Sequence, residues 1–256
     1  MTDLDARRPV TVRGVTLGTG TPAVIVPLTA RTPAELVAQA APVVAARPDL
    51  VEWRVDHLLA GGSDLAAVVE AGRALVAALD GLPLLATIRT GAEGGELPMP
   101  GEEYLVVYRA LLEAGIADLV DVELRHATAA RVIAAAHDAG VPVVASNHDF
   151  DGTPDREEIE RRLLAMAEQG ADVLKIAVMP RSPEDVLTLL SATLAVRRRV
   201  DQPLITMAMA GTGVVSRLAG GVFGSAATFG TVGAASAPGQ VEVDALRRTL
   251  ALVHQD

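Results

Sequence analysis

The sequence lacks cysteine and is poor in aromatic residues, and both absences narrow what the protein can be. Without cysteine there are no disulfide bonds and no thiolate metal sites. Phe, Tyr and Trp make up 2% of the 256 residues and hydrophobic residues 50%, so we expect a core built mainly of Ala, Val and Leu. No apolar run reaches the ~18 residues that span a bilayer, and no apolar signal core follows the first charged residues. We therefore expect a cytoplasmic protein that does not enter the membrane.

The chain also has fewer basic than acidic residues. Asp and Glu number 32 against 22 for Lys and Arg, and the formal net charge is −10. A surface of this sign repels nucleic acid and anionic lipid, so we expect neither as a partner. A local group of arginines can still bind a small anionic molecule.

Lysine is the scarcest charged residue, because Lys175 is the only one in the chain. It lies inside an apolar run, Asp172-Val-Leu-Lys-Ile-Ala-Val178, that is typical of a buried strand. Burying an ammonium is costly unless it is paired or loses its proton, and a neutral buried amine is a nucleophile toward carbonyls. The alternative is a lysine at a strand end that reaches out to water.

Short apolar runs alternate with segments of helical spacing at a period near 30 residues, which predicts a (β/α)8 TIM barrel as a single domain over 1–256. A doubly wound open sheet is the alternative. The segment 10–17 alternates like a short N-terminal β-hairpin, and Pro42 should bend or break the first helix. The predicted barrel strands are 23–28, 50–56, 83–89, 118–124, 141–148, 172–178, 203–209 and 225–230.

Five consecutive predicted strands carry charged or polar side chains on one face, because alternate residues of a strand point the same way. In a barrel the apolar face packs on the helices, so these side chains would meet inside, near the carboxyl ends where barrel active sites lie. A half-exposed antiparallel sheet would instead turn them to water. The shared-face residues are Glu52, Arg54 and Asp56; Thr87 and Arg89; Asp121 and Glu123; Ser146 and His148; and Lys175.

These residue types together indicate chemistry on a carbonyl compound. Arg54 and Arg89 are permanently charged, and we expect them to keep the nearby Lys175 amine uncharged and nucleophilic. His148 can move protons near neutral pH. A lysine beside a histidine favours Schiff-base chemistry, although a lone histidine at a strand end is more often structural.

The segment 202–241 contains a single charged residue, Arg217. It can hold a substrate carboxylate or phosphate, or simply cap a helix. The loop 231–240, which comes after the last predicted strand, is rich in small residues. It is either a mobile lid that contributes Ser236 and Gln240 or a plain flexible connection.

Several of these segments resemble, in order, the motifs of the type I 3-dehydroquinate dehydratases, the Schiff-base dehydroquinases of the shikimate pathway. The resemblance runs from about residue 23 to the end. Its motifs are Glu52-Trp-Arg54-Val-Asp, Thr87-Ile-Arg89-Thr with Glu93-Gly-Gly-Glu, Ser146-Asn-His148-Asp-Phe, Lys175-Ile-Ala-Val-Met-Pro, Ser216-Arg217-Leu-Ala-Gly, Phe223-Gly-Ser-Ala-Ala-Thr-Phe229-Gly and Ser236-Ala-Pro-Gly-Gln240.

The resemblance implies a reaction and a set of roles. Lys175 forms an imine with the C3 ketone of 3-dehydroquinate, and His148, oriented by Glu93, removes the C2 proton and protonates the departing C1 hydroxyl in a syn elimination. Asp121 is a supporting carboxylate. The resemblance further implies a homodimer that needs no metal or organic cofactor. The implied substrate-binding residues are Glu52, Arg54, Arg89, Arg217, Ser236 and Gln240.

Two departures from the family pattern accompany the resemblance: Pro27 replaces a hydroxyl residue of some members, and Ala210-Gly-Thr-Gly213 replaces a more charged segment. Three other functions are alternatives. A class I aldolase also uses a strand lysine, and a non-catalytic sugar-acid-binding module should lack Lys175 or His148. A metallohydrolase is disfavoured because no His-x-His pair lies in the first strands.

Overall fold

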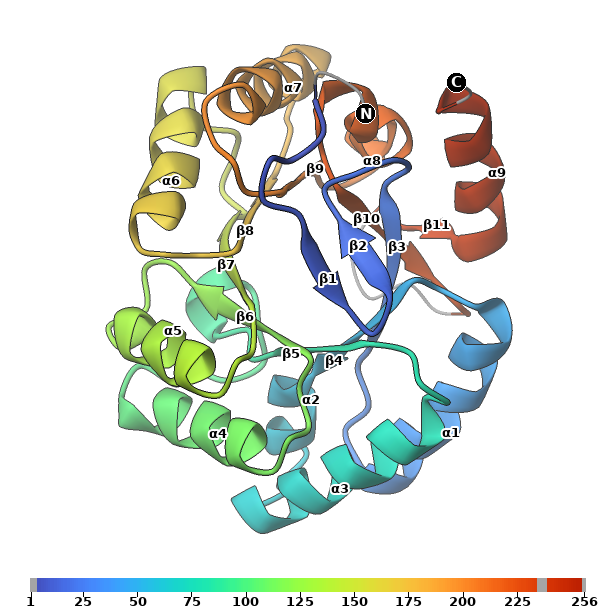
Figure 1. Ribbon diagram of the computed structural model, residues 1–256, viewed down its shortest axis with the longest axis vertical. Coiled ribbons are helices and arrows are strands. Elements are labelled where there is room, and N and C mark those ends of the chain that lie inside the picture. Colours follow the sequence, from blue (N-terminus) through green and yellow to red (C-terminus); the bar gives the residue numbers. More distant parts are fainter. Residues whose placement is uncertain (1–3, 234–238, 255–256) are drawn as a thin grey trace.

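The structure, a computed structural model, describes residues 4–233 and 239–254. Its centre is a curled parallel sheet surrounded by helices (Figure 1), with the strands in the order β11-β10-β3-β4-β5-β6-β7-β8-β9. The strands of the barrel wall are β3 (Ala23–Leu28), β4 (Leu50–Arg54), β5 (Leu84–Thr87), β6 (Leu119–Glu123), β7 (Val143–Asp149), β8 (Val173–Val178), β9 (Leu204–Ala208) and β10 (Ala227–Thr231). The short strand β11 (Val241–Glu242) pairs parallel with the end of β10.

The wall closes between β9 and β10. An isolated parallel bridge joins Leu204 to Ser225, and the Ala226 N–H donates to the Leu204 carbonyl. The Ser225 hydroxyl accepts the Thr206 N–H at 3.1 Å, so a side chain stands in for a strand carbonyl at this seam. Closure confirms the (β/α)8 barrel and excludes the doubly wound open sheet.

The helices form the outer ring seen in Figure 1 and follow the strands in alternation. Helix α1 begins after Thr32, whose side chain accepts the Glu35 N–H. It continues through Pro42 to Ala46, so the expected break at this proline is wrong. The helices are α1 (Pro33–Ala46), α2 (Val55–Ala60), α3 (Leu65–Ala78), α4 (Glu102–Glu113), α5 (Ala129–Asp138), α6 (Arg156–Glu168), α7 (Pro183–Arg197), α8 (Val214–Ala219) and α9 (Val243–Val253), with short 3-10 turns η1 (Gly91–Glu93) and η2 (Gly220–Phe223).

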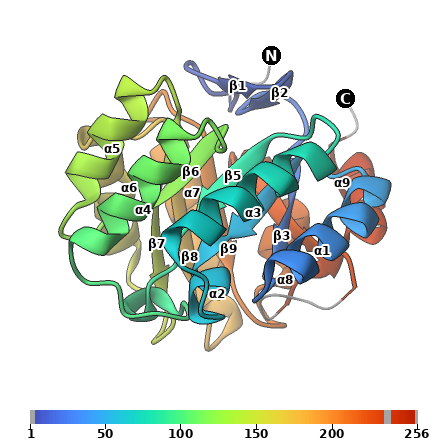
Figure 2. The ribbon, with the colours of Figure 1, turned by 90° about the horizontal axis from the view of Figure 1, so that it is seen from below.

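The predicted N-terminal hairpin is present as β1 (Val10–Val12) and β2 (Val15–Leu17), paired antiparallel. Figure 2 shows it lying across one end of the barrel. Val12 and Leu17 are buried in one cluster with the first inward-facing residues of the wall, among them Leu50, Leu85 and Leu119. The hairpin therefore closes the amino end of the barrel with apolar side chains and leaves the carboxyl end for a site.

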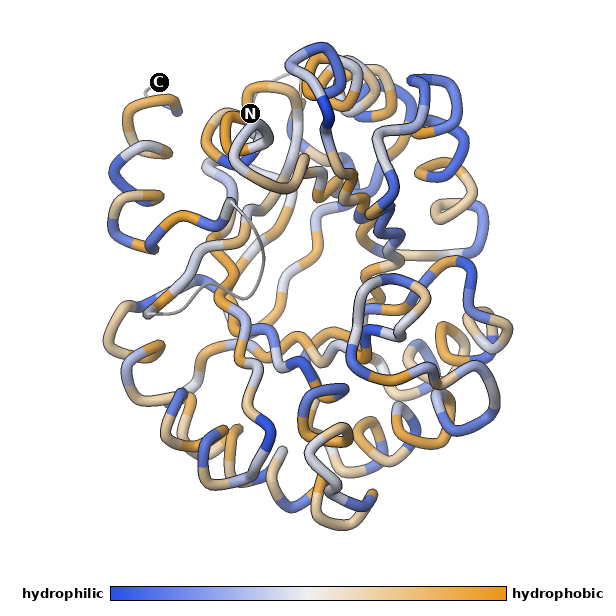
Figure 3. Tube along the Cα trace, turned by 180° about the vertical axis from the view of Figure 1, so that it is seen from behind, coloured by the Kyte–Doolittle hydropathy of each residue, from blue (hydrophilic) through white to orange (hydrophobic). Residues whose placement is uncertain are grey.

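The two faces of each strand pack as the alternation predicts. On β8, Leu174, Ile176 and Val178 lie in the cluster under the outer helices, whereas Val173 and Ala177 lie in the inner cluster. Figure 3 shows the barrel from behind, with hydrophobic and hydrophilic residues alternating along the tube. Among the residues that the structure describes, no helix is both long and apolar enough to cross a membrane.

Two polar positions do not lie on strands as expected. Strand β4 ends at Arg54 and α2 begins at Val55, which places Asp56 in the first turn of a helix. Strand β5 ends at Thr87, so Arg89 follows it in the loop. Both side chains are nevertheless buried, because each has charged partners at the carboxyl end of the barrel.

Candidate active site

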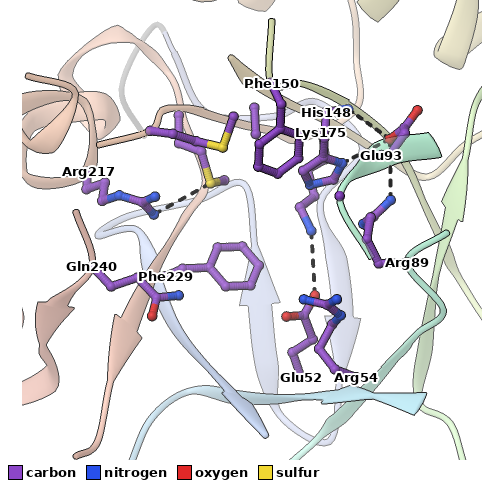
Figure 4. A pocket seen from close by; sticks show the side chains of 14 residues that line it. Glu52, Arg54, Arg89, Glu93, His148, Phe150, Lys175, Arg217, Phe229 and Gln240 are labelled. Carbon is purple, nitrogen blue, oxygen red and sulfur yellow. Dashed lines mark hydrogen bonds and ion pairs between the residues drawn. The ribbon is translucent and has the colours of Figure 1, made fainter. Parts of the chain in front are cut away.

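A cavity of about 300 Å³ opens at the carboxyl end of the barrel (Figure 4). This volume suits a small molecule. Eight of the nine residues proposed from the sequence line it, and Ser236 lies outside the described residues. The lining residues are Glu52, Arg54, Arg89, Glu93, Gly94, His148, Phe150, Lys175, Ala177, Met207, Met209, Arg217, Phe229 and Gln240.

Lys175 points into this cavity from the middle of β8 and is only 3% exposed. Its Nζ donates to Asp121 Oδ2 at 2.7 Å and lies 3.6 Å from Glu52 Oε1. The same atom is 4.7 Å from the centroid of the Phe229 ring. The alternative of a lysine reaching out to water is therefore excluded. The expected uncharged amine is also not what the contacts show, because two carboxylates and an aromatic face surround Nζ as they would an ammonium.

Asp121 is the carboxylate that joins this amine to the rest of the barrel interior. It is fully buried, and its Oδ1 accepts from Arg89 Nη2 at 2.6 Å and from the Ser146 hydroxyl at 2.5 Å. Burial alone would raise the pKa of Asp121, but the charges of Arg89 and Lys175 outweigh it and hold that pKa well below its usual range. Asp121 is thus the anion that compensates two buried cations.

Arg89 has acceptors on several strands. Its Nη1 donates to Glu123 Oε1 and to Ser146 Oγ, both at 3.0 Å, and lies 3.5 Å from Glu93 Oε2. Glu123 also accepts the backbone N–H and the hydroxyl of Thr90, both at 2.7 Å. A planar guanidinium can satisfy several carboxylates at once, so Arg89 ties the ends of β5, β6 and β7 together.

His148, at the end of β7, contacts the carboxylate of Glu93 from η1. Glu93 Oε2 accepts the His148 backbone N–H at 2.8 Å and lies 3.1 Å from its Nδ1. Burial, reinforced by the charges of Arg89 and Lys175, lowers the pKa of His148 well below its ordinary value. The imidazole is therefore neutral, and a carboxylate at Nδ1 fixes the tautomer that carries its proton there. The lone pair on Nε2 is then available as a base.

The groups around Glu93 shift its pKa in opposite directions. Burial raises its pKa to about 7, with the Arg89 charge opposing and the Glu123 charge adding to the shift. Its Oε1 accepts the side-chain amide of Asn147 at 2.9 Å, which favours the ionised carboxylate. Because Glu93 and His148 are in contact, they titrate as a pair rather than as independent groups.

Arg54 approaches the cavity from the end of β4, held by a bidentate pair with Asp56: Nε to Oδ1 at 2.8 Å and Nη2 to Oδ2 at 2.7 Å. Burial would raise the pKa of Asp56, but the hydrogen bond and charge of Arg54 lower it below the ordinary value. Asp56 also accepts the backbone N–H groups of Arg89 and Glu96. One helical carboxylate therefore positions both an arginine and the loop that carries Glu93.

Arg217 reaches the cavity from α8 and is 3% exposed. Burial lowers its pKa to about 10, so it remains charged near neutral pH. Its Nη1 lies 3.7 Å from the Met207 sulfur. The Ser216 hydroxyl accepts the Ala208 N–H and donates to the Gly213 carbonyl, which fixes the start of α8 despite the small residues that precede it.

Sequence reasoning missed three kinds of residue at this site. Asn147 lies on the outward side of its strand and was not expected to contact Glu93. Phe229 was noted only within a motif, although its ring faces Lys175. Met207, Met209 and Phe150 line the cavity, but apolar residues at strand ends carry no sequence signal that separates them from the core.

Comparison with known proteins agrees with this geometry. The family model for type I 3-dehydroquinases matches residues 24–256. A 3-dehydroquinate dehydratase of Listeria welshimeri is 50% identical over 248 residues, which are 96% of this chain and 98% of that protein. This chain belongs to the type I 3-dehydroquinases. The membership decides against the class I aldolase that a strand lysine also allows.

Solved structures extend the likeness to three dimensions. The 3-dehydroquinate dehydratase of Geobacillus kaustophilus superposes with a TM-score of 0.93 at 37% identity, covering 99% of this chain and 98% of that one. A type I enzyme of Clostridium difficile, solved with covalently modified comenic acid, gives a TM-score of 0.91 at 40% identity and covers 98% of both chains. Within the residues described for this type I 3-dehydroquinase, no three His, Cys, Asp or Glu side chains gather as a metal site would require.

Proposed function

We propose that this chain converts 3-dehydroquinate to 3-dehydroshikimate and water through an imine on Lys175. The amine adds to the C3 ketone, and loss of water gives the protonated imine. Removal of the C2 proton sends its electron pair toward the imine nitrogen, and the C1–O bond then breaks with protonation of the leaving hydroxyl. Hydrolysis of the imine returns the lysine. The observation that carries this proposal is a single buried amine sharing a small cavity with a histidine–carboxylate pair.

The proposed imine step requires Lys175 to lose a proton when the ketone enters. Asp121 is a poor acceptor because its pKa is so low. The neutral imidazole of His148 lines the same cavity and is the better base. The iminium that follows keeps one positive charge near Asp121 and Glu52, so the ion pairing of the resting site also supports the intermediate.

In the proposed elimination, His148 removes the C2 proton with Nε2 and later gives a proton to the C1 oxygen. Glu93 at Nδ1 stabilises the imidazolium that forms between these steps. One base serving both atoms requires that they leave from the same face of the ring, which is the geometry of a syn elimination.

The remaining residues are proposed to hold the substrate. Arg217, charged and almost fully buried, is suited to the substrate carboxylate, and Gln240 lines the same cavity. Ser236, which the family resemblance also implies for substrate binding, lies outside the described residues. Glu52 and Arg54 are suited to ring hydroxyls. Arg89 also lines the cavity, but its hydrogen bonds to Asp121, Glu123 and Ser146 favour a share in organising the site besides any contact with substrate.

Borohydride reduction in the presence of dehydroquinate tests nucleophile and substrate together. The expected result is a stable mass increment on the peptide that contains Lys175, and none on the Lys175→Ala variant, which should lose dehydration while retaining weak ligand binding. An unmodified peptide at saturating substrate, or full turnover by Lys175→Ala, would refute the imine.

We further propose one catalytic domain over 1–256 that works as a cytoplasmic homodimer, supported by the resemblance to the family. Light scattering of the purified chain measures the oligomeric state, and a molecular mass of one chain would count against the dimer.

A further inference from the structure

A chain of hydrogen bonds leads from the outer surface of the barrel to the catalytic histidine. Arg162 on α6 donates from Nη1 to Asn147 Oδ1 at 2.9 Å. Asn147 donates from Nδ2 to Glu93 Oε1 at 2.9 Å. The other oxygen of Glu93 contacts His148 at both its backbone N–H and its Nδ1. Asn147 is 1% exposed and Arg162 is 8% exposed, so this connection is almost entirely removed from water.

Arg162 decides which way the Asn147 amide faces. A guanidinium only donates hydrogen bonds, so the atom of Asn147 facing it must be the oxygen. The NH₂ group is then directed at Glu93, where it can only donate. Arg162 itself is held by Glu158 Oε1 at 2.7 Å and by Asp149 Oδ2 at 3.0 Å, which fixes its position between α6 and the end of β7.

We propose that Asn147, oriented by Arg162, is a positioning residue that keeps Glu93 ionised and aimed at His148 during the elimination. The inference rests on the proposed function, because it concerns the acid-base pair of that reaction. Neither residue lines the cavity, so both act through Glu93 rather than on the substrate.

The charges around Glu93 explain why one neutral donor matters. Arg89 Nη1, at 3.5 Å, is the nearest cation, but it also serves Glu123 and Ser146. The Glu123 carboxylate adds a like charge that favours the protonated form of Glu93. With burial acting in the same direction, the Asn147 amide is one of the few contacts that favour the carboxylate. A protonated Glu93 would carry no negative charge to stabilise the imidazolium of His148, so the base would weaken.

The experiment is the pH profile of kcat/KM for dehydroquinate in Asn147→Leu, which keeps the volume and removes the donor. Because the donor favours the charged form, its loss should move the acid limb upward by about one pH unit. Activity should then fall about tenfold at pH 6 and change little at pH 9. Groups facing the pair from the other strands, Arg54, Asp121 and Lys175 among them, are unchanged in this variant.

Helix α6 offers a matched control. Arg162→Met should shift the acid limb in the same direction, and Arg162→Lys, which can still donate to the Asn147 oxygen, should restore most of it. Arg161→Gln removes a neighbouring cation that also pairs with Glu158 but has a side chain 65% exposed, and it should leave the profile unchanged.

The outcomes separate this inference from the proposed function. A wild-type protein that neither dehydrates dehydroquinate nor is trapped by borohydride overturns the function. An active wild type with an unshifted acid limb in folded Asn147→Leu overturns only the role of Asn147. An equal shift in Arg161→Gln and Arg162→Met does the same, because it would show a nonspecific effect of helix charge. If Asn147→Leu does not fold, the comparison of Arg162→Met with Arg162→Lys decides the role of Asn147, and an acid limb that is the same in both variants overturns it.

Discussion

Asp121→Asn is the change that tests the buried charge balance most directly. The carboxylate contacts Arg89, Lys175 and Ser146 at 2.5–2.7 Å and is not exposed at all. Asparagine has nearly the same shape but no charge, and its NH₂ group must face at least one of these donors. Removing one partner of a buried ion pair costs about 3–5 kcal/mol, because the remaining charge stays buried without compensation.

We expect a loss of at least about 3 kcal/mol in the free energy of unfolding, which for a chain of this size lowers Tm by roughly 6–12 °C. Urea unfolding at pH 7 measures the first and calorimetry the second. Glu102→Gln is the control, because its pair with Arg131 has side chains 66% and 53% exposed and should be worth no more than about 1 kcal/mol.

The pH dependence of this loss has a definite sign. The pKa of Asp121 is lower in the folded than in the unfolded chain, so its contribution is complete above the unfolded pKa and is lost as pH falls through the folded one. The gap between wild type and Asp121→Asn should therefore be about 1 kcal/mol smaller at pH 3 than at pH 7. A loss below about 1 kcal/mol at pH 7, or a gap that widens in acid, would refute the assignment of Asp121 as the central counter-charge.

Three further results are expected from enzyme assays. His148→Ala should still form the imine but dehydrate roughly 10²–10⁴-fold more slowly, and an unchanged rate would assign the base elsewhere. In the wild type, kcat/KM should fall as pH is lowered through about 7, where Glu93 takes up a proton, and a flat profile between pH 6 and 8 would contradict its role. Arg217→Met should raise KM for dehydroquinate roughly tenfold or more with a smaller effect on kcat, whereas an unchanged KM would place the carboxylate elsewhere.

Much of the barrel could be predicted from the sequence, because both the two-residue alternation of strands and the apolar spacing of helices are strong in it. The run 23–28 forms a strand with the predicted limits, and the other strands differ by a few residues at their ends. The inward direction of Lys175, Asp121 and Glu123 followed from alternation alone. Because helices cover the outside of the barrel, the apolar face of each strand packs outward against them and the polar face points inward. The resemblance then supplied the roles.

The errors have local physical causes. Asp56 was placed on a strand because alternation continues past Arg54, but the backbone turns into α2 one residue later. Pro42 did not end α1, as packing of the helix on the barrel outweighs one lost hydrogen bond. The charge state of Lys175 depends on which counter-charges reach its nitrogen. Asp121 reaches it, while Arg54 is paired with Asp56, and Arg89 with Glu123 and the other oxygen of Asp121. Such contacts follow from three-dimensional distances that no sequence spacing contains.

The basic residues inside the barrel divide into an arginine that organises the interior and a lysine that reacts. Arg89 can bridge several carboxylates and keeps its proton at any working pH, so it organises the interior without competing for the substrate ketone. Lys175 contributes one amine that can exchange an ion pair for an imine. Because every other basic side chain in the chain is arginine or histidine, the only other amine is the α-amino group. A reducible adduct with a carbonyl compound at the barrel centre can therefore form on one side chain only, and its loss in Lys175→Ala cannot be masked by a second lysine.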